Sequence, residues 1–385
     1  MAADSDHPVS PRGVAILGST GSIGTTALRV LARQEDRFRV TALTAFSNAA
    51  LLAEQAARFR PRYVGLVRNG EGEHPGWGQG DGCLIEAATC DAADIVLNAV
   101  VGAAGLDATL AALERGKRVA LANKETLVMG GSLVAEAARR GGGELVPVDS
   151  EHSAILQCIA GRPMTEVRRL VITASGGPFR RWSKHQLEQA TLADALQHPT
   201  WRMGRKITVD SASLANKALE VIEAHFLFAL PYDRIEVVVH PQSVVHSFVE
   251  FVDGSVLAQL GVPSMELPVL YALSYPDRLA DTGIPPFDPV ELSPLTFEKV
   301  RAEEFPALAL GIQAGRQGGA APAVFNAANE QAVAFFLEGS IRFGDIPRAI
   351  DSALRRHGDA PAGSRGAILD ADASARRHVQ ELFRC

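Results

Sequence analysis

Two carboxylates separated by one residue, Asp149 and Glu151, stand directly after the apolar segment 144–148. In an extended segment, side chains at i and i+2 point to the same side, so both carboxylates would face one point. Two acids this close repel each other unless a proton or a cation lies between them, and carboxylate oxygens suit a divalent cation. The pair therefore indicates a metal site, although an ordinary polar turn or a helix N-terminus also fits these residues.

A second polar group lies in the segment 210–228, which the pattern predicts to be one helix capped at Asp210 or Ser211. One face of this helix carries a hydroxyl, an amide, an ammonium and a carboxylate, from Ser213, Asn216, Lys217 and Glu220. Asn216 and Lys217 could bind a phosphate, and Glu220 could complete a three-carboxylate metal site with the pair at 149 and 151. The alternative is a structural salt bridge between Lys217 and Glu220, worth roughly a few tenths of a kcal/mol.

A glycine-rich turn, Gly18-Ser-Thr-Gly-Ser-Ile-Gly24, follows an expected strand and opens an expected helix. Glycines there let the backbone turn tightly and approach a pyrophosphate, whose charge lies at the helix N-terminus. A tight strand–helix turn without a ligand is the alternative. Further polar residues follow later strands at the edge where cofactor and substrate meet in such sheets. They are Asn98, Asn123, Lys124 and Glu125.

The end of the second expected strand, Thr44-Ala-Phe-Ser47-Asn48, bears on the choice between NAD and NADP. An acidic residue at this place accepts a hydrogen bond from the ribose and repels a 2′-phosphate. None is present, so the phosphate is permitted. Arginine and lysine are also missing, so the segment favours NADP only weakly.

The segment 175–206 is expected to form a lid. Glycines after Ser175 and at Gly204 are candidate hinges, and Trp201 would cover the site and exclude water. Ser175 and His198 would reach a substrate anion; the alternative is that these residues pack within a loop. Four other histidines have no metal-ligand spacing and are read as structural: His152, His225, His240 and His246.

The elements that must position these residues fall into three expected domains. Short β-branched runs alternate with alanine-rich stretches over residues 13–149, which predicts a Rossmann-like parallel sheet. Residues 150–282 predict an α+β catalytic and dimerisation domain, with Asp253-Gly254 as a hairpin turn. Residues 283–304 are proline-rich and predict a linker, and 305–385 predict a small helical domain. The fold class is therefore α/β.

The composition narrows the class of protein. The chain has 385 residues and a net charge of −6, which disfavours a nucleic-acid partner. No apolar run reaches the roughly 20 residues of a membrane span, and residues 1–12 are expected to be a frayed tail rather than a signal peptide. The 4 cysteines have no CxxC spacing, which favours the cytoplasm. Only Lys117, Lys124, Lys184, Lys206, Lys217 and Lys299 are lysines, so arginine is the default cation.

Together these motifs resemble one family. They are GSTGSIG (18–24), LANKE (121–125), PVDSEH (147–152), SGGPF (175–179), HPTWRMGRKITVDSASLANKALE (198–220), HPQSVVHS (240–247) and NAANE (326–330). The family is 1-deoxy-D-xylulose 5-phosphate reductoisomerase, of the non-mevalonate pathway to isoprenoid precursors. The resemblance implies a homodimer that uses NADPH and Mg²⁺, Mn²⁺ or Co²⁺ to convert 1-deoxy-D-xylulose 5-phosphate into 2-C-methyl-D-erythritol 4-phosphate.

The resemblance also implies roles for individual residues. The metal ligands would be Asp149, Glu151 and Glu220. The catalytic group would be these three with Lys124. Substrate contacts would come from Lys124, Ser150, Glu151, Ser175, His198, Ser211, Asn216, Lys217 and Glu220. The cofactor would lie against Thr20, Gly21, Ser22, Ile23, Ser47, Asn48, Asn123, Glu125 and Gly204.

One segment departs from the family pattern. Members usually carry Ala-Gly-Arg/Lys-Asn after the second strand, with the basic residue facing the 2′-phosphate, whereas this chain has Ala45-Phe-Ser-Asn48. The departure predicts a smaller preference for NADPH over NADH than a member with arginine at position 47 would show. Two other functions remain open from the residues: another metal-dependent NAD(P) oxidoreductase of this fold, and a non-catalytic nucleotide-sensing protein.

Overall fold

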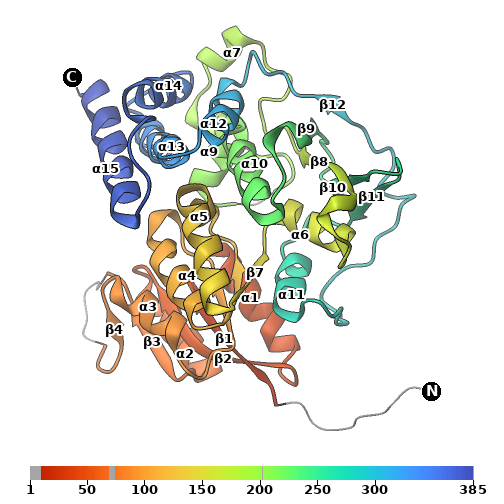
Figure 1. Ribbon diagram of the computed structural model, residues 1–385, viewed down its shortest axis with the longest axis vertical. Coiled ribbons are helices and arrows are strands. Elements are labelled where there is room, and N and C mark those ends of the chain that lie inside the picture. Colours follow the sequence, from red (N-terminus) through yellow and green to blue (C-terminus); the bar gives the residue numbers. More distant parts are fainter. Residues whose placement is uncertain (1–9, 69–73, 202, 385) are drawn as a thin grey trace. The chain divides into compact units, whose positions relative to one another are not determined.

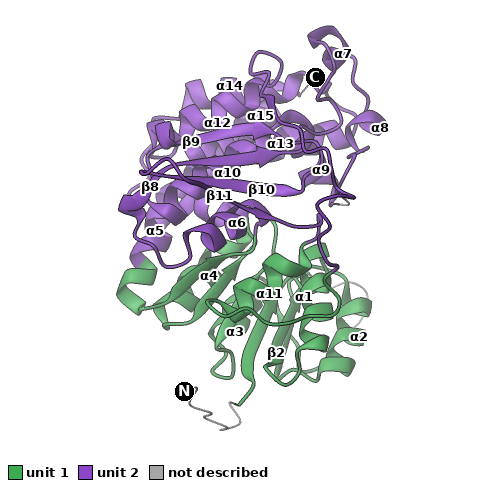
Figure 2. Ribbon diagram, turned by 90° about the vertical axis from the view of Figure 1, so that its right-hand side faces the viewer, with its two compact units in different colours: residues 1–123, 137–148, 265–284 green, residues 124–136, 149–264, 285–385 purple. Residues whose placement is uncertain are grey.

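The computed structural model describes residues 10–68, 74–201 and 203–384, so most of the expected tail lies outside the described residues. The chain divides into two compact units (Figure 2). Unit 1 comprises residues 1–123, 137–148 and 265–284, and unit 2 comprises residues 124–136, 149–264 and 285–385. Every described helix is too short or too polar to cross a lipid bilayer.

Unit 1 is built on a seven-stranded sheet in the order β4-β3-β2-β1-β5-β6-β7, with all neighbours parallel. The strands are β1 (Arg12–Leu17), β2 (Phe38–Ala45), β3 (Tyr63–Leu66), β4 (Gly78–Gln79), β5 (Ile95–Asn98), β6 (Arg118–Leu121) and β7 (Glu144–Pro147). The central strands are buried along almost their whole length, as a parallel sheet covered on both faces requires. The predicted Rossmann-like sheet is confirmed.

Helices connect and accompany these strands (Figure 1). They are α1 (Ser22–Arg33), α2 (Ala49–Phe59), α3 (Gly82–Thr89), α4 (Gly105–Glu114), α11 (Glu266–Ser274) and the end of α5 (Lys124–Gly141), whose residues 124–136 belong to unit 2. Each of the first two begins where a strand ends: Gly21 caps α1, and the side chain of Asn48 caps α2 by accepting the Leu51 N–H at 3.2 Å. The helix starts therefore gather at the carboxyl edge of the sheet, where ligands bind in this fold.

Unit 2 holds a five-stranded mixed sheet in the order β11-β10-β8-β9-β12. The strands are β8 (Val167–Ala174), β9 (Ile235–Val239), β10 (Val245–Phe251), β11 (Val256–Leu260) and β12 (Glu298–Lys299). Strands β10 and β11 are antiparallel and turn at Gly254, whose φ of 85° suits glycine. The hairpin predicted at Asp253-Gly254 is thus confirmed.

The helices of unit 2 share one hydrophobic core, which runs from Val128 to Val379 and includes the C-terminal helices. They are α6 (Ser150–Ile159), α7 (Lys184–Glu188), α8 (Leu192–Ala195), α9 (Arg205–Ser213), α10 (Ala215–Phe228), α12 (Pro306–Gln317), α13 (Ala321–Leu337), α14 (Asp345–His357) and α15 (Arg365–Leu382). The helical C-terminal region is as expected. It packs on the same core as residues 149–264, and the three-domain division remains a prediction.

Two local expectations are wrong. The segment 210–228 is not one helix, because Leu214 adopts φ 61° and separates α9 from α10. Asp210 and Ser211 therefore lie inside α9 rather than at a cap. The carboxylates at 149 and 151 do not belong to an extended segment either: Asp149 caps α6, and its side chain accepts the Glu151 N–H at 3.2 Å.

Candidate active site

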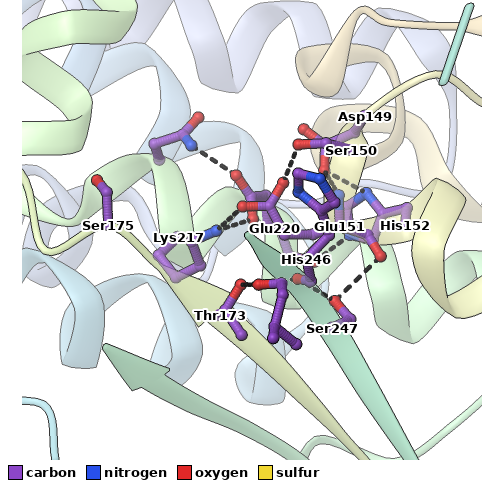
Figure 3. A network of polar contacts seen from close by, with 12 residues as sticks. Asp149, Ser150, Glu151, His152, Thr173, Ser175, Lys217, Glu220, His246 and Ser247 are labelled. Carbon is purple, nitrogen blue, oxygen red and sulfur yellow. Dashed lines mark hydrogen bonds and ion pairs between the residues drawn. The ribbon is translucent and has the colours of Figure 1, made fainter. Parts of the chain in front are cut away.

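Three carboxylates converge in unit 2. The ligand oxygens of Asp149, Glu151 and Glu220 all lie within 4.8 Å of one another. The first two come from the start of α6 and the third from the second turn of α10, so one helix N-terminus and one helix face supply the whole set. Figure 3 shows Glu151 and Glu220 directed at the same point from their two helices.

Two lysines neutralise this cluster. The Nζ of Lys217 lies 2.7 Å from Glu151 Oε1 and also contacts Glu220 Oε2. The Nζ of Lys124, the first residue of α5, contacts Asp149 Oδ2 and lies 3.2 Å from Glu220 Oε1. Both lysines are buried. A buried ammonium is stable only beside negative charge, so the five side chains form one interdependent ionic cluster.

The electrostatics of the cluster follow from burial and charge. Burial alone would raise the pKa of Asp149, but the charges around it, of which Lys124 is the largest, together with the Lys124 hydrogen bond outweigh burial, and the pKa falls below its ordinary value. For Glu220, burial followed by the negative charges of Asp149 and Glu151 raises the pKa. The pKa of Lys217 is raised because Glu151 and Glu220 outweigh its burial. An additional positive charge between the carboxylates would thus be favourable.

The donor set fits a hard divalent cation. Three carboxylates offer only oxygen, the ligand that Mg²⁺ and Mn²⁺ prefer over nitrogen or sulfur. Beside them, Asn216 donates to Glu220 Oε1 at 2.5 Å, while its own Oδ1 is buried without a hydrogen-bond partner. That unpaired oxygen is a further sign that the cluster is arranged for a ligand.

Sequence reasoning missed Glu223, which lies one turn after Glu220 on α10 and is buried. Its Oε2 lies 3.8 Å from the Nζ of Lys124 and 3.8 Å from Nδ1 of His152, and it has no hydrogen-bond partner. Burial raises its pKa to about 7. The signal was present, because Glu223 continues the polar stripe by three residues.

His152 is a buried, hydrogen-bonded histidine, as the sequence predicted. It is fully buried, and its Nε2–H donates to the backbone carbonyl of Glu220 at 2.9 Å. This bond ties α6 to α10 and so fixes the two helices that carry the three carboxylates. On the other side, Ser247 of β10 donates to the carbonyl of Glu151 at 3.1 Å (Figure 3).

Ser175 and His198 form a second polar pair. The Nδ1 of His198 accepts the backbone N–H groups of Thr200 and Trp201 at 3.1 and 2.8 Å, which leaves the proton on Nε2. Nε2–H then donates to Ser175 Oγ at 2.9 Å. Burial lowers the pKa of His198 to about 4, so the ring is neutral near pH 7. Because Ser175 only accepts within this pair, its hydroxyl hydrogen is available for an anion.

The loop that carries Ser175 lies against the C-terminal half of α9. Gly177 has φ 64°, and a Cβ there would come within 2.8 Å of the Ser211 carbonyl oxygen. Glycine is therefore required at 177 for close approach as well as for backbone freedom. Phe179, two residues on, is fully buried and packs on Trp182 and Phe343. The start of the expected lid is thus anchored in the core, and Arg202 within it lies outside the described residues.

In unit 1, the glycine-rich turn has the geometry of a phosphate-binding turn. Gly18 has φ 83°, and a Cβ there would lie 2.8 Å from the Ala99 carbonyl oxygen. A Cβ on Gly24 would lie 2.3 Å from the carbonyl oxygen of Gly18, so α1 starts as close to β1 as a backbone can. Between them stand Thr20, Gly21, Ser22 and Ile23. Their backbone N–H groups lie at the N-terminus of α1.

The other expected cofactor residues are distributed over both units. Asn123 in unit 1 donates to the carbonyls of Val100 and Gly102, each at 3.0 Å, and Asn98 donates to Thr109 at 2.8 Å, so both order strand-end loops. Ser47 and Asn48 are exposed at the end of β2. In unit 2, Glu125 Oε1 lies 3.1 Å from the Nζ of Lys206, and Gly204 caps α9.

Comparison with known proteins shows to which family the chain belongs. Residues 14–131 match the 1-deoxy-D-xylulose 5-phosphate reductoisomerase family, 145–228 its C-terminal domain, and 260–378 the DXP reductoisomerase C-terminal domain. The chain belongs to the 1-deoxy-D-xylulose 5-phosphate reductoisomerase family. Reductoisomerases from Synechococcus sp. (strain JA-2-3B'a(2-13)) and Chloroherpeton thalassium are 52% and 51% identical to it, each covering 96% of this chain and 97% of the relative.

Solved reductoisomerase structures share the fold. The Zymomonas mobilis reductoisomerase in complex with NADPH is 43% identical, with a TM-score of 0.89 over 97% of this chain and 99% of that one. A DOX-P reductoisomerase in complex with NADPH, fosmidomycin and magnesium is 38% identical, with a TM-score of 0.90 over 97% of this chain and 98% of the other. The family named from the sequence motifs is therefore confirmed.

Proposed function

We propose that this protein converts 1-deoxy-D-xylulose 5-phosphate into 2-C-methyl-D-erythritol 4-phosphate with NADPH and a divalent cation. The observation that carries the proposal is the convergence of Asp149, Glu151 and Glu220 on one point beside two buried lysines, in a reductoisomerase chain. Relatives that match nearly the whole chain are named 1-deoxy-D-xylulose 5-phosphate reductoisomerase. One of the similar structures holds NADPH, fosmidomycin and magnesium together.

Asp149, Glu151 and Glu220 would hold the cation. When bound, a divalent cation polarises a carbonyl and stabilises the oxyanions that form as a carbon skeleton rearranges. His152 holds the carboxylate-bearing helices together, and Asn216 orients Glu220 by a hydrogen bond. The three carboxylates are thus oriented before the substrate enters, which lowers the reorganisation that they need in the reaction.

Lys124 and Lys217 would exchange their carboxylate partners for the substrate when a cation is bound. With a cation between the carboxylates, the two ammonium groups are no longer needed for neutralisation and can turn to the substrate. Lys124 and Ser150 then contact its hydroxyl and carbonyl end, and Lys217 and Asn216 contact its phosphate. Glu223, at 3.8 Å, remains beside Lys124 and is a counter-charge for it when ionised.

The phosphate would also be held by Ser175, His198 and Ser211. Ser175 donates its free hydroxyl hydrogen, while neutral His198 fixes the orientation of that hydroxyl. Ser211 lies beside this loop because Gly177 packs on its backbone. Binding the phosphate far from the reacting carbons orients the substrate and favours closure of the 175–206 segment with Trp201 over it.

The cofactor would bind along the turn at residues 20–23, and NADPH supplies the hydride. The remaining contacts are assigned to Ser47, Asn48, Asn123, Glu125 and Gly204. Residues 13–149 would mainly bind NADPH, and 150–282, together with Lys124 and Asp149, would hold metal and substrate. Residues 305–385 share the core of the second region, with 283–304 as linker. The expected cytoplasmic location stays a prediction.

A homodimer is part of the proposal. Strand β11 stands at the edge of the described five-stranded sheet and exposes Val256, Leu257 and Leu260 by 53%, 40% and 36%. An open apolar edge strand is a template for pairing with another chain, and a second copy would cover it.

The test is oxidation of NADPH by the purified protein with 1-deoxy-D-xylulose 5-phosphate. We expect substrate-dependent oxidation with added Mn²⁺ or Mg²⁺, and its loss in EDTA with recovery when the cation is restored. Folded protein that fails to oxidise NADPH under these conditions would rule the proposed function out. NADPH oxidation that persists in EDTA would support the reductase activity but contradict the proposed dependence on a divalent cation.

A further inference from the structure

A cation stands near the position where the family pattern is broken. Arg68 follows β3, the neighbour of β2, and the parallel pairing of the two strands continues past their ends. The N–H of Val67 donates to the carbonyl of Ala45 at 3.0 Å, and that of Arg68 to the carbonyl of Phe46 at 2.6 Å. Arg68 is therefore fixed beside the segment that carries Ser47 in place of the usual arginine or lysine.

The side chains of this pair face each other. The Arg68 guanidinium carbon lies 4.8 Å from the centroid of the Phe46 ring, a cation–π distance. Phe46 is 56% exposed, which is unusual for a large aromatic residue, and Arg68 is exposed as well. Within the described residues, no carboxylate forms an ion pair with Arg68. The charge and one exposed aromatic side chain are thus presented together to solvent.

The end of β2 is also tied to the glycine-rich turn. The N–H groups of Gly18 and Ser19 donate to the Thr44 carbonyl at 3.0 and 2.8 Å. Gln55 of α2 clamps the same turn, donating to the Ser19 carbonyl at 3.0 Å and accepting from Ser19 Oγ at 2.7 Å. A pyrophosphate at the turn would therefore direct the rest of its nucleotide toward the end of β2.

The chemistry around this strand end suits an adenosine bearing a 2′-phosphate. A guanidinium binds phosphate through a planar fork of N–H donors. Its flat face can also stack on an aromatic base. Ser47 and Asn48 stand at the N-terminus of α2, where the helix dipole favours negative charge. An acidic side chain, which would select the free ribose, is absent from the segment 44–48.

We propose that Arg68 binds the 2′-phosphate of NADPH, in place of the basic residue that family members usually carry at the position of Ser47. This assignment rests on the proposed use of NADPH. It makes Arg68 and Phe46 specificity-determining residues: the guanidinium reads the phosphate, and the ring holds the guanidinium in place. Preference for NADPH is thereby kept although the usual cation is missing.

The experiment measures binding of 2′,5′-ADP and of 5′-AMP to the full-length protein by calorimetry, with EDTA and no substrate. In Arg68→Met, the affinity for 2′,5′-ADP should fall about tenfold or more, and that for 5′-AMP should stay within about twofold. Arg58→Met is the matched control. Its guanidinium carbon lies 5.1 Å from the Phe59 ring centroid at the far end of α2, and its loss should change neither affinity.

A second substitution tests the same assignment without relying on one variant. Adding Ser47→Arg to Arg68→Met should restore the 2′,5′-ADP affinity, because it returns the cation to the usual family position. Equal weakening of both nucleotides, or no weakening of 2′,5′-ADP, would overturn the role of Arg68 while leaving NADPH use intact. Wild-type protein that binds neither nucleotide would overturn both this inference and the proposed cofactor.

Discussion

The individual side chains of the site are governed by charge balance. Three carboxylates within 4.8 Å of one another are held by two buried lysines, each with at least two acidic partners. From the sequence, Lys217 and Glu220 could be placed on one helix face, because their spacing fixes that. The meeting of Lys124 with Asp149 could not be derived from periodicity, since it depends on how α5, α6 and α10 pack.

Glu223 gives the site a pH-dependent stability. Its pKa is about 7 in the folded protein, against an ordinary value of 4.5, so between these values the folded chain keeps a proton that the unfolded chain releases. Stability therefore falls as pH rises through this window, by on the order of 3 kcal/mol. Glu223→Gln cannot ionise and should flatten this dependence.

Urea unfolding at several pH values between about 5 and 8, in EDTA, measures the effect. Glu236→Gln is the control, since Glu236 is a partly exposed acid of β9 paired with Arg169. Parallel pH profiles for wild type and Glu223→Gln would show that Glu223 does not carry the dependence.

At the scale of elements, the strands were predictable and the breaks were not. β-branched or apolar runs mark β1, β2, β3, β5, β6 and β7, because buried parallel strands need continuous apolar residues. Strand β4 (Gly78–Gln79) has no such residue and was not predicted. The break at Leu214 was invisible, since leucine rarely adopts positive φ and only the packing of α9 and α10 requires it. Likewise, the metal-site interpretation placed Asp149 and Glu151 in an extended segment, whereas the structure has the alternative, a helix N-terminus capped by Asp149.

A series of partly buried ion pairs links the last helix to α9. Arg376 of α15 donates to Glu330 Oε2 at 2.5 Å and to Asp372 Oδ1 at 2.7 Å. The Nζ of Lys206, on the first turn of α9, lies 3.8 Å from Glu330 Oε1 and 2.9 Å from Asp210 Oδ2. Through Glu330, the last residue of NAANE (326–330), these ion pairs anchor the helix that carries Ser211.

Arg376→Met should therefore destabilise the protein by about 2–3 kcal/mol, because it leaves two largely buried carboxylates without their partner. Chemical unfolding gives the free energy. Arg355→Met on α14 removes an ion pair whose side chains are 80% and 40% exposed, and it should cost no more than about 0.5 kcal/mol. Similar losses of unfolding free energy in the two variants would mean that the ion pairs through Glu330 do not stabilise the protein.

At the scale of the whole molecule, the sequence supplied the family and the fold class through motifs spread over nearly the entire chain. The extent of the unit 2 core could not be predicted from the sequence, because the apolar faces of α12 to α15 do not show which elements they pack against. The assembly also lies beyond a sequence pattern. For β11, period-2 alternation cannot separate a strand facing solvent from one facing a second copy.

The apolar edge at β11 predicts a dimer in solution. Light scattering coupled to size-exclusion chromatography should give twice the 40.9 kDa chain mass for the wild type. Leu257→Lys places a charge on the exposed edge and should shift the mass toward the monomer, whereas Val290→Lys, at a side chain 82% exposed outside any strand, should not. A wild-type monomer would remove the dimer from the account.

The central claim is that the three carboxylates bind the cation on which the reaction depends, and one measurement addresses it directly. NADPH oxidation with 1-deoxy-D-xylulose 5-phosphate and Mn²⁺ is compared for wild type, Glu220→Gln and Glu223→Gln. We predict that Glu220→Gln lowers kcat/KM at least about a hundredfold with the fold retained, and that Glu223→Gln keeps the wild-type dependence on Mn²⁺. Near-wild-type turnover by Glu220→Gln, at the same Mn²⁺ concentration, would contradict the claim.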